Sequence, residues 1–250
     1  MIKNTPKQVI ILGVKVSSTS KDEVLDFVMF RLKKKLNFFI TTPNPEIIVK
    51  AQTDYKLREA LNYSDIALPD GVGLKVKPRI TGREMFEELL ILSNKLKLKV
   101  FLLGAEPKVN NSAVEKIVKD YPNVKIKGRG DIYVNNEGDF DIEMGTKTYI
   151  DIIRDINNFK PDLLFVALGA PKQEKWVYKN LKNLKIGGAM VIGGTLDYFT
   201  GKMPLPPKFI SKSGLEWLWR LTFQPQRVGR IFKAVFIFPL YLTKEKLFGK

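Results

Sequence analysis

The chain has 250 residues, with 42 Lys and Arg side chains against 26 Asp and Glu, so its formal net charge is +16. It contains no cysteine, which excludes disulfide bonds, thiolate nucleophiles and zinc sites with Cys ligands. It also contains no histidine, so any acid–base chemistry falls to Asp, Glu, Lys or Tyr. The excess of positive charge predicts an anionic partner: nucleic acid, an acidic membrane surface or a phosphorylated substrate.

Short apolar runs alternate along the chain with longer amphipathic stretches. The runs predict strands at residues 9–14, 38–42, 66–68, 100–104, 163–168 and 190–193. The amphipathic stretches predict helices at residues 21–34, 45–63, 82–96, 112–121, 147–159 and 171–181. This alternation is typical of an α/β fold, here a Rossmann-like core with a mainly parallel sheet and helices on both faces. No uncharged apolar stretch approaches the roughly 18 residues of a spanning helix, and the N-terminus lacks the pattern of a signal peptide.

Polar residues follow the second and third of these strands. Thr42 and Asn44 flank a proline where the second strand gives way to a helix. Asn44 can be the N-cap of that helix, and the same geometry can aim its side chain and the helix N–H groups at a ligand. Asp70 follows the third strand and stands beside Gly71 and Gly73. It can be a turn or cap residue, or a catalytic base on a backbone that the glycines open to a ligand.

Two later segments resemble each other, FLLGAEPK at 101–108 and VALGAPKQ at 166–173. Each runs from a strand into Gly-Ala and a proline, a residue favoured in the first helical turn. Both predict a turn from a strand into a helix at the carboxyl edge of the sheet, where α/β proteins usually bind ligands. Turns of this kind also resemble each other without a shared function. The second segment places Lys172 and Gln173 at the start of a helix.

The composition changes after about residue 200. Residues 201–250 hold ten Lys and Arg against two Glu, together with nine of the aromatic residues. The stretch KMPLPPKF predicts a linker, followed by short helices that are broken near Pro225 and Pro239. We therefore expect a catalytic core over residues 1–200 and a basic, aromatic helical appendage over residues 201–250. The aromatic side chains of the appendage either enter a membrane interface or dock on the core.

The two best-marked nucleotide-binding loops, G-x-G-x-x-G and G-x-x-x-x-G-K-[ST], are absent from the sequence. Asp139 and Asp141, in NEGDFDIE, form an Asp-x-Asp pair that could hold a metal ion bridging two phosphates. Their neighbours Asn135 and Gly138 are more typical of a solvated turn. We therefore expect no metal site and no other cofactor.

The sequence resembles the WecG/TagA/CpsF family of glycosyltransferases in seven motifs that follow the family's order: TTPNPE, ALPDGVG, RITGREMF, FLLGAEP, ALGAPKQE, IGGTLDYFTG and EWLWRLTFQPQR. The resemblance spans roughly residues 10–235 and is greatest to the TagA branch of Gram-positive bacteria. It implies an inverting, metal-independent enzyme that transfers N-acetylmannosamine from its UDP derivative to the 4-hydroxyl of GlcNAc-diphospho-undecaprenol, in wall teichoic acid linkage-unit synthesis. Such an enzyme is cytoplasmic and peripheral on the inner face of the cell membrane, where its appendage meets anionic lipid.

The resemblance also implies roles for single residues. Asp70 aligns with the proposed catalytic base of the family. Arg220, Arg227 and Arg230 align with tail arginines that complete the active site at the membrane. The substrate-binding residues that it implies are Thr42, Asn44, Arg83 and Gln173. At Glu84 many relatives have Asp, a departure that bears on the choice of donor.

The chemistry of the residues agrees with these roles. Inversion needs one base to take the proton of the acceptor hydroxyl, and without His a carboxylate at the sheet edge is the natural candidate. Arg or Lys can stabilise the leaving UDP without a metal ion. One alternative is a glycosyltransferase of the same fold that uses UDP-N-acetylmannosaminuronate or UDP-glucose. Another, from a different class, is a nucleic-acid-binding protein, for which basic charge and exposed aromatic residues are also typical; the favoured interpretation has no nucleic-acid partner.

Overall fold

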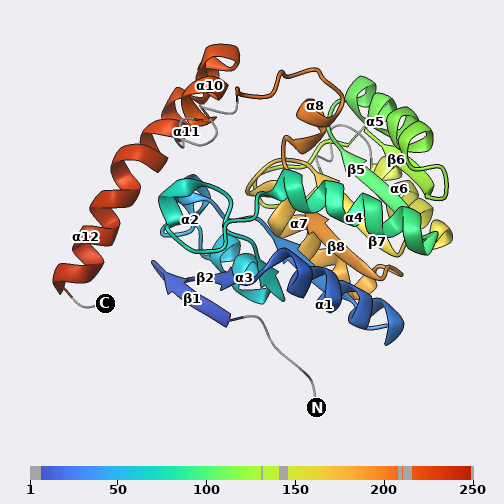
Figure 1. The fold of residues 1–250 in the computed structure, drawn as a ribbon, viewed down its shortest axis with the longest axis horizontal. Coiled ribbons are helices and arrows are strands. Elements are labelled where there is room, and N and C mark those ends of the chain that lie inside the picture. The colour runs from blue at the N-terminus through green and yellow to red at the C-terminus, as the bar shows by residue number, and fades with distance from the viewer. Residues whose placement is uncertain (1–6, 131, 141–145, 208–209, 211–215, 249–250) are drawn as a thin grey trace.

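Six parallel strands form the central sheet of the protein, in the order β4-β3-β8-β7-β5-β6 (Figure 1). The computed structural model describes residues 7–130, 132–140, 146–207, 210 and 216–248, without the side chains of residues 72, 146–149, 216, 217, 220 and 227. The strands of the sheet are β3 (Phe38–Thr41), β4 (Ile66–Ala67), β5 (Lys99–Gly104), β6 (Lys125–Arg129), β7 (Leu163–Ala167) and β8 (Gly188–Val191). The predicted α/β class with a parallel sheet is confirmed.

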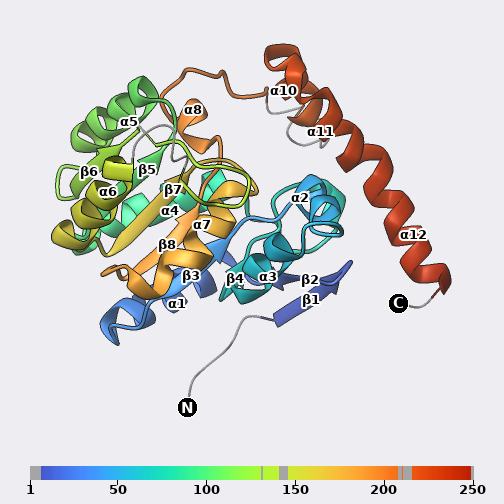
Figure 2. The same cartoon turned by 180° about the vertical axis from the view of Figure 1, so that it is seen from behind.

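Helices cover both faces of this sheet (Figures 1 and 2). Residues of one face, such as Phe38 and Phe165, pack against α1 (Lys21–Lys33), α4 (Gly82–Leu96), α5 (Pro107–Asp120) and α8 (Thr195–Phe199). Residues of the opposite face, such as Phe39 and Val166, pack against α6 (Thr146–Phe159) and α7 (Lys172–Asn180), which a short turn, η3 (Leu181–Asn183), follows. Phe38 and Phe39 therefore enter different cores, as the alternation of side chains along a strand requires.

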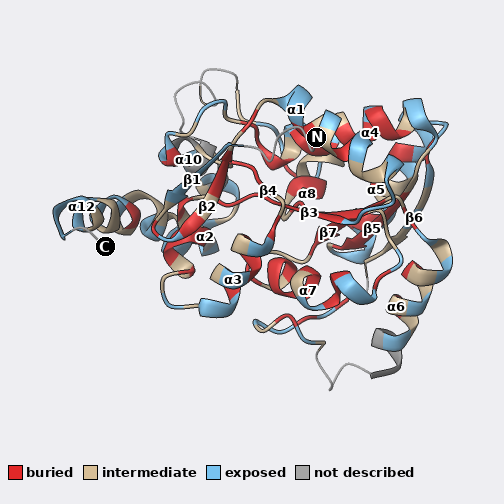
Figure 3. Cartoon of the chain, turned by 90° about the horizontal axis from the view of Figure 1, so that it is seen from below, coloured by how far each residue is buried: buried red, intermediate tan, exposed pale blue. Residues whose placement is uncertain are grey.

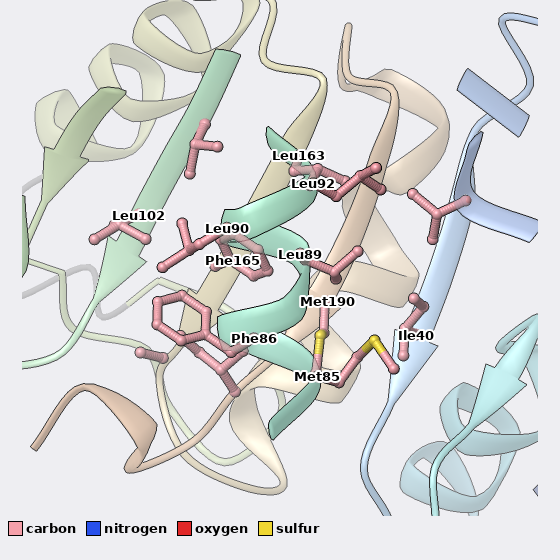
Figure 4. Packing of buried hydrophobic residues seen from close by; sticks show 14 of the residues in the cluster. Ile40, Met85, Phe86, Leu89, Leu90, Leu92, Leu102, Leu163, Phe165 and Met190 are labelled. Atoms are coloured by element: carbon pink, nitrogen blue, oxygen red, sulfur yellow. The ribbon is translucent and has the colours of Figure 1, made fainter. Parts of the chain in front are cut away.

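Helix α4 shows how the sequence forms this core. Thr81 and Glu84 make a capping box that begins the helix, and the apolar side chains of one helix face then point at the sheet (Figure 4). The ring of Phe86 meets that of Phe165 edge-on, with the ring centres 4.8 Å apart. Because both rings are fully buried, Phe86→Ala would cost about 3–5 kcal/mol of stability.

Two stretches differ from the sequence-based prediction at the N-terminal end. The single strand expected at 9–14 is a β-hairpin of β1 (Lys7–Ile11) and β2 (Val14–Ser18), which forms a sheet of its own. Leu12 and Gly13 both adopt positive φ in its two-residue turn, but Leu12 carries no turn signal within the apolar run. The helix expected at 45–63 is divided into α2 (Pro45–Lys50) and α3 (Tyr55–Tyr63), because the Asp54 carboxylate accepts the Leu57 N–H at 3.0 Å and begins a second helix.

Strand β6 was also missed by the sequence-based prediction. It lies at the edge of the sheet, and its sequence KIKGR alternates cations with small or apolar residues. A charged edge strand protects the sheet from pairing with other chains, but it lacks the apolar run that marks a buried strand.

The C-terminal segment is helical and packs against the hairpin side of the protein. It consists of α10 (Glu216–Phe223), η4 (Pro225–Arg227), α11 (Val228–Phe232), a π-helical turn, η5 (Lys233–Ile237), and α12 (Phe238–Phe248). The expected break at Pro225 is present, whereas the break expected at Pro239 is wrong. Pro239 has no N–H to donate, and its ring would crowd a carbonyl of the preceding turn in a regular α-helix. The preceding turn is instead a wider π-helical turn, so the helix continues through Pro239.

The C-terminal helices dock on the core through one side chain above all. Phe238 is 2% exposed and belongs to the same apolar cluster as Ile47 and Ile48 of α2. The rest of α12 extends beyond the body of the protein, where most of its residues are exposed (Figure 3). Among the helices that the structure describes, none has the length and apolar character needed to cross a membrane.

Candidate active site

A pocket with a cavity volume of about 140 Å³ lies at the carboxyl ends of β3, β4, β7 and β8. This edge is where open α/β sheets bind their ligands. The lining residues are Thr42, Asn44, Glu46, Ile47, Asp70, Thr81, Arg83, Gly169, Ala170, Gln173, Ile192, Gly193, Gly194, Thr195, Tyr198, Pro206 and Arg230. Of the eight predicted site residues, six therefore meet here. The other two, Arg220 and Arg227, have side chains outside the part of the chain that the structure describes.

The turn from β3 into α2 supplies Thr42 and Asn44. The Asn44 Oδ1 atom accepts the Ile47 N–H at 2.9 Å, so Asn44 caps the helix and also lines the pocket. The capping role predicted for Asn44 is therefore confirmed, and its contact with a ligand stays a prediction. Thr42 is buried beside the first residue of α4: a Cβ added to Gly82 would lie 3.1 Å from its Cγ2 atom. This close approach brings Arg83 to the pocket.

The loop after β4 carries Asp70, which is partly buried in the pocket wall. The Asp70 N–H donates to the Pro43 carbonyl at 3.0 Å, which joins this loop to the β3–α2 turn. Gly71 has a φ of +118°, and a Cβ on Gly73 would lie only 2.8 Å from Pro45 Cγ. Gly71 is thus needed for its positive φ, and Gly73 because the loop packs closely on Pro45 at that residue.

The side chains of Arg83 and Glu84, at the start of α4, point to different surroundings. The Arg83 guanidinium lies 5.8 Å from the centre of the Tyr198 ring, across the pocket wall. The Glu84 carboxylate accepts hydrogen bonds from the Thr81 N–H and hydroxyl, each at 2.8 Å. Glu84, the position at which many relatives have Asp, therefore serves the capping box and is not among the residues that line the pocket.

The paired segments noticed in the sequence are the carboxyl ends of neighbouring strands, since Gly104 of β5 pairs with Ala167 of β7. The turn after β7 belongs to the pocket. In it, Gln173 is almost fully buried, and its Oε1 atom accepts the N–H groups of Gly169 at 3.2 Å and Gly193 at 3.0 Å. Gln173 therefore joins the turns that follow β7 and β8.

Glu174 is a buried ionisable residue to which the sequence analysis gave no role. It is 0% exposed and accepts a hydrogen bond from the Gln173 amide at 2.9 Å. Burial raises the pKa of its carboxyl from 4.5 to about 7. The five consecutive residues 173–177 are all buried, so α7 has no solvent-facing side at this point. The apolar periodicity of the sequence therefore does not indicate that Glu174 is buried.

Replacing Glu174 with Gln should therefore stabilise the protein increasingly as the pH rises. Between pH 4.5 and 7 the folded carboxyl keeps a proton that the unfolded chain has lost, so the wild-type protein loses stability over this range while the Gln variant does not. The difference should approach about 3 kcal/mol above pH 7. Denaturant unfolding of both proteins at pH 5 and pH 8 measures it, and a difference independent of pH would contradict the burial of a titrating group.

The C-terminal segment adds a cation and an apolar wall to the pocket. Arg230 Nε lies 3.6 Å from Glu46 Oε1, and Pro206 lines the pocket from the linker. The linker itself is held in place, because Lys202 pairs with Glu106 at 2.7 Å and the Trp219 indole N–H donates to the Pro204 carbonyl at 3.0 Å.

The acidic loop at 135–140 lies away from this pocket. Asn135 Oδ1 accepts the N–H groups of Glu137 and Asp139, a local turn, and the Asp139 carboxylate pairs with Lys179 at 2.7 Å. Asp141 lies outside the described residues. Within the described part of the chain, no three Asp or Glu side chains gather in a way that could hold a metal ion.

A parallel α/β sheet with a polar pocket at its carboxyl edge, bordered by Arg83 and Arg230, has the form of an α/β enzyme whose pocket can accept a phosphorylated ligand. The chain belongs to the glycosyl transferase WecG/TagA/CpsF family, whose model matches residues 9–250. The family resemblance seen in the motifs is thereby confirmed.

Two bacterial relatives are similar over most of their length. The N-acetylglucosaminyldiphosphoundecaprenol N-acetyl-beta-D-mannosaminyltransferase of Bacillus subtilis strain 168 is 35% identical in an alignment 228 residues long, gaps included, that covers 86% of this chain and 82% of the relative. The enzyme with the same name from Staphylococcus aureus strain MRSA252 is 31% identical in an alignment 254 residues long, gaps included, that covers 97% of this chain and 94% of the relative.

Proposed function

We propose that the protein transfers N-acetylmannosamine from UDP-N-acetylmannosamine to the 4-hydroxyl of GlcNAc-diphospho-undecaprenol, with inversion to a β-1,4 linkage. The relatives named for this reaction match nearly the whole chain. The observation that carries the proposal is the pocket, in which a carboxylate, Asp70, shares one cavity with two arginines, Arg83 and Arg230. A base and cations in one place are what a sugar transfer from a diphosphate requires.

In the reaction, the Asp70 carboxylate takes the proton of the acceptor hydroxyl. At the same time, the oxygen of that hydroxyl forms a bond to the anomeric carbon. The bond from that carbon to the UDP oxygen breaks, and the electron pair leaves with UDP. Arginine side chains can bind the diphosphate with paired hydrogen bonds and offset the charge that develops on it. Arg83 and Arg230 take this role in the pocket, and we assign the same role to Arg220 and Arg227. Thr42, Asn44 and Gln173 bind or position the donor.

The partner of residues 201–250 is an anionic membrane surface on the inner face of the cell membrane. Beside the docked face with Phe238, the C-terminal helices carry exposed apolar side chains at four-residue intervals, namely Val228, Phe232, Phe236 and Leu240. Lysines at 233, 244 and 246 accompany them. A helix with exposed aromatic and basic residues fits the boundary between headgroups and acyl chains. Residues 201–250 thus act as the appendage and residues 1–200 as the core.

The test is a donor screen with a short-chain, lipid-diphosphate-linked GlcNAc acceptor. We expect transfer from UDP-N-acetylmannosamine, and we expect it to persist in excess EDTA. Faster transfer from UDP-N-acetylmannosaminuronate or UDP-glucose would assign another donor. Loss of activity with EDTA and recovery with Mg²⁺ would contradict a metal-independent reaction. Salt-dependent binding of oligonucleotides without any transfer would instead favour the nucleic-acid-binding alternative.

A further inference from the structure

Gln173 lines the pocket, and its neighbour Glu174, which is not among the lining residues, is hydrogen-bonded to it. Gln173 is 2% exposed and Glu174 is 0% exposed. Burying a carboxyl group is unfavourable unless its hydrogen bonds compensate, and the Oε2 atom of Glu174 has no hydrogen-bond partner among the described residues. A buried carboxyl of this kind weakens the fold, so its presence calls for a function.

The surroundings of the Gln173 amide leave only one orientation for it. Its Oε1 atom faces two N–H donors, from Gly169 and Gly193, and its Nε2 atom faces the Glu174 carboxyl at 2.9 Å. Turning the amide over would set its NH₂ group against the two N–H donors, and all of these donors would then lack acceptors. The acceptor on Glu174 opposes this flip.

The two glycines depend on Gln173 for their position. Gly169 and Gly193 have φ values of +76° and +50°, and a Cβ added to either would touch no atom closer than 3.9 Å. There is thus open space where side chains would otherwise pack at these two positions, and glycine leaves the backbone more conformational freedom than any other residue. The hydrogen bonds to Gln173 Oε1 join the two turns and set their spacing along one wall of the pocket.

We propose that Glu174 is a positioning residue for the transfer reaction: by accepting the Gln173 amide N–H, it keeps the amide oxygen on Gly169 and Gly193 and so preserves the wall that receives the donor. This role rests on the proposed function. It requires a hydrogen-bond acceptor at position 174 and no negative charge.

The experiment compares Glu174→Met with Glu174→Gln in the full-length protein. Met matches the length of the side chain without an acceptor, whereas Gln retains an acceptor oxygen for the Gln173 amide. We expect Glu174→Met to lower kcat/KM for the donor by about 10–100-fold, because misplaced binding groups are costly, and mainly through a higher KM. Glu174→Gln should stay within about threefold of the wild type. Glu115→Met, on the exposed side of α5, is the matched control and should leave kinetics unchanged.

Two further readouts separate positioning from folding. At pH 8 the unfolding midpoint of Glu174→Met should equal or exceed that of the wild type, since a buried carboxyl has been removed. Hydrogen exchange of the Gly169 and Gly193 amides should become at least about tenfold faster in Glu174→Met but not in Glu174→Gln.

Three results would overturn the proposal: wild-type kinetics in Glu174→Met, an equal loss in both variants, or unchanged exchange of the two glycine amides. The exchange measurement needs no substrate, so it tests whether Glu174 positions Gln173 and the two glycines even if the donor screen fails. If the wild-type protein binds no UDP-sugar but Glu174→Met still speeds exchange at the two glycines, the proposed function is rejected, and the role of Glu174 in positioning Gln173 is not.

Discussion

Asp70→Asn should lower the rate of sugar transfer by about 10²–10⁴-fold without unfolding the protein, because the amide cannot take the proton of the acceptor hydroxyl. The backbone contact that holds the loop, from the Asp70 N–H to the Pro43 carbonyl, is unaffected by this change. Initial rates at saturating donor and acceptor measure the effect, and circular dichroism and thermal unfolding check the fold.

Two variants sharpen this experiment. Glu46, the other carboxylate among the pocket-lining residues, lies beside the Arg230 guanidinium, so Glu46→Gln should disturb arginine placement and cost less than Asp70→Asn. Asp26→Asn, on the exposed side of α1, controls for the substitution itself and should be silent. If Asp70→Asn turns over at the wild-type rate, or if Glu46→Gln alone abolishes transfer, Asp70 is not the base.

Truncation after Pro207 should reduce transfer by at least about 10²-fold and abolish binding to anionic vesicles. The cut keeps the linker contacts of Lys202 and the pocket wall at Pro206, but it removes Arg230 and the other tail arginines, to which we assign stabilisation of the leaving group. It also removes the proposed membrane-binding face, in which we expect each basic residue to contribute about 1 kcal/mol near an anionic surface. Loss of Phe238 exposes part of α2, so the core should also lose about 1.5–3 kcal/mol of stability.

Point variants separate these effects. Arg230→Ala should lower transfer to a water-soluble acceptor and leave vesicle co-sedimentation nearly intact. The double variant Phe232→Ser, Phe236→Ser should do the reverse, because both rings are exposed and are not among the residues that line the pocket. Tyr55→Ser with Tyr133→Ser, two exposed aromatic residues of the core, is the matched control. If the truncated core transfers sugar to the soluble acceptor as fast as the full chain, the C-terminal segment serves only in membrane binding and its arginines have no part in the reaction.

The class of fold, the family and most of the polar residues around the pocket could be predicted without the structure. Strand and helix periodicity depends on neighbours a few residues apart, so β3, β5, β7 and α4 could be predicted from it. Local capping chemistry likewise placed Asn44 at the start of α2. The errors lie where local signals are weak or conflict: the hairpin turn at Leu12, the charged edge strand β6, and Pro239, which a π-helical turn accommodates.

The groups that lie far apart in the chain and meet in the fold could not be predicted in this way. Arg230 reaches Glu46 because Phe238 docks the C-terminal helices on α2, and Gln173 joins Gly169 to Gly193 because β7 and β8 are neighbours in the sheet. The burial of Glu174 is also a tertiary effect, since a Glu in the first turn of a helix normally faces solvent. The strength of a hydrogen bond and the pKa of a carboxyl depend on what surrounds them in space, and a linear pattern carries no information about those surroundings.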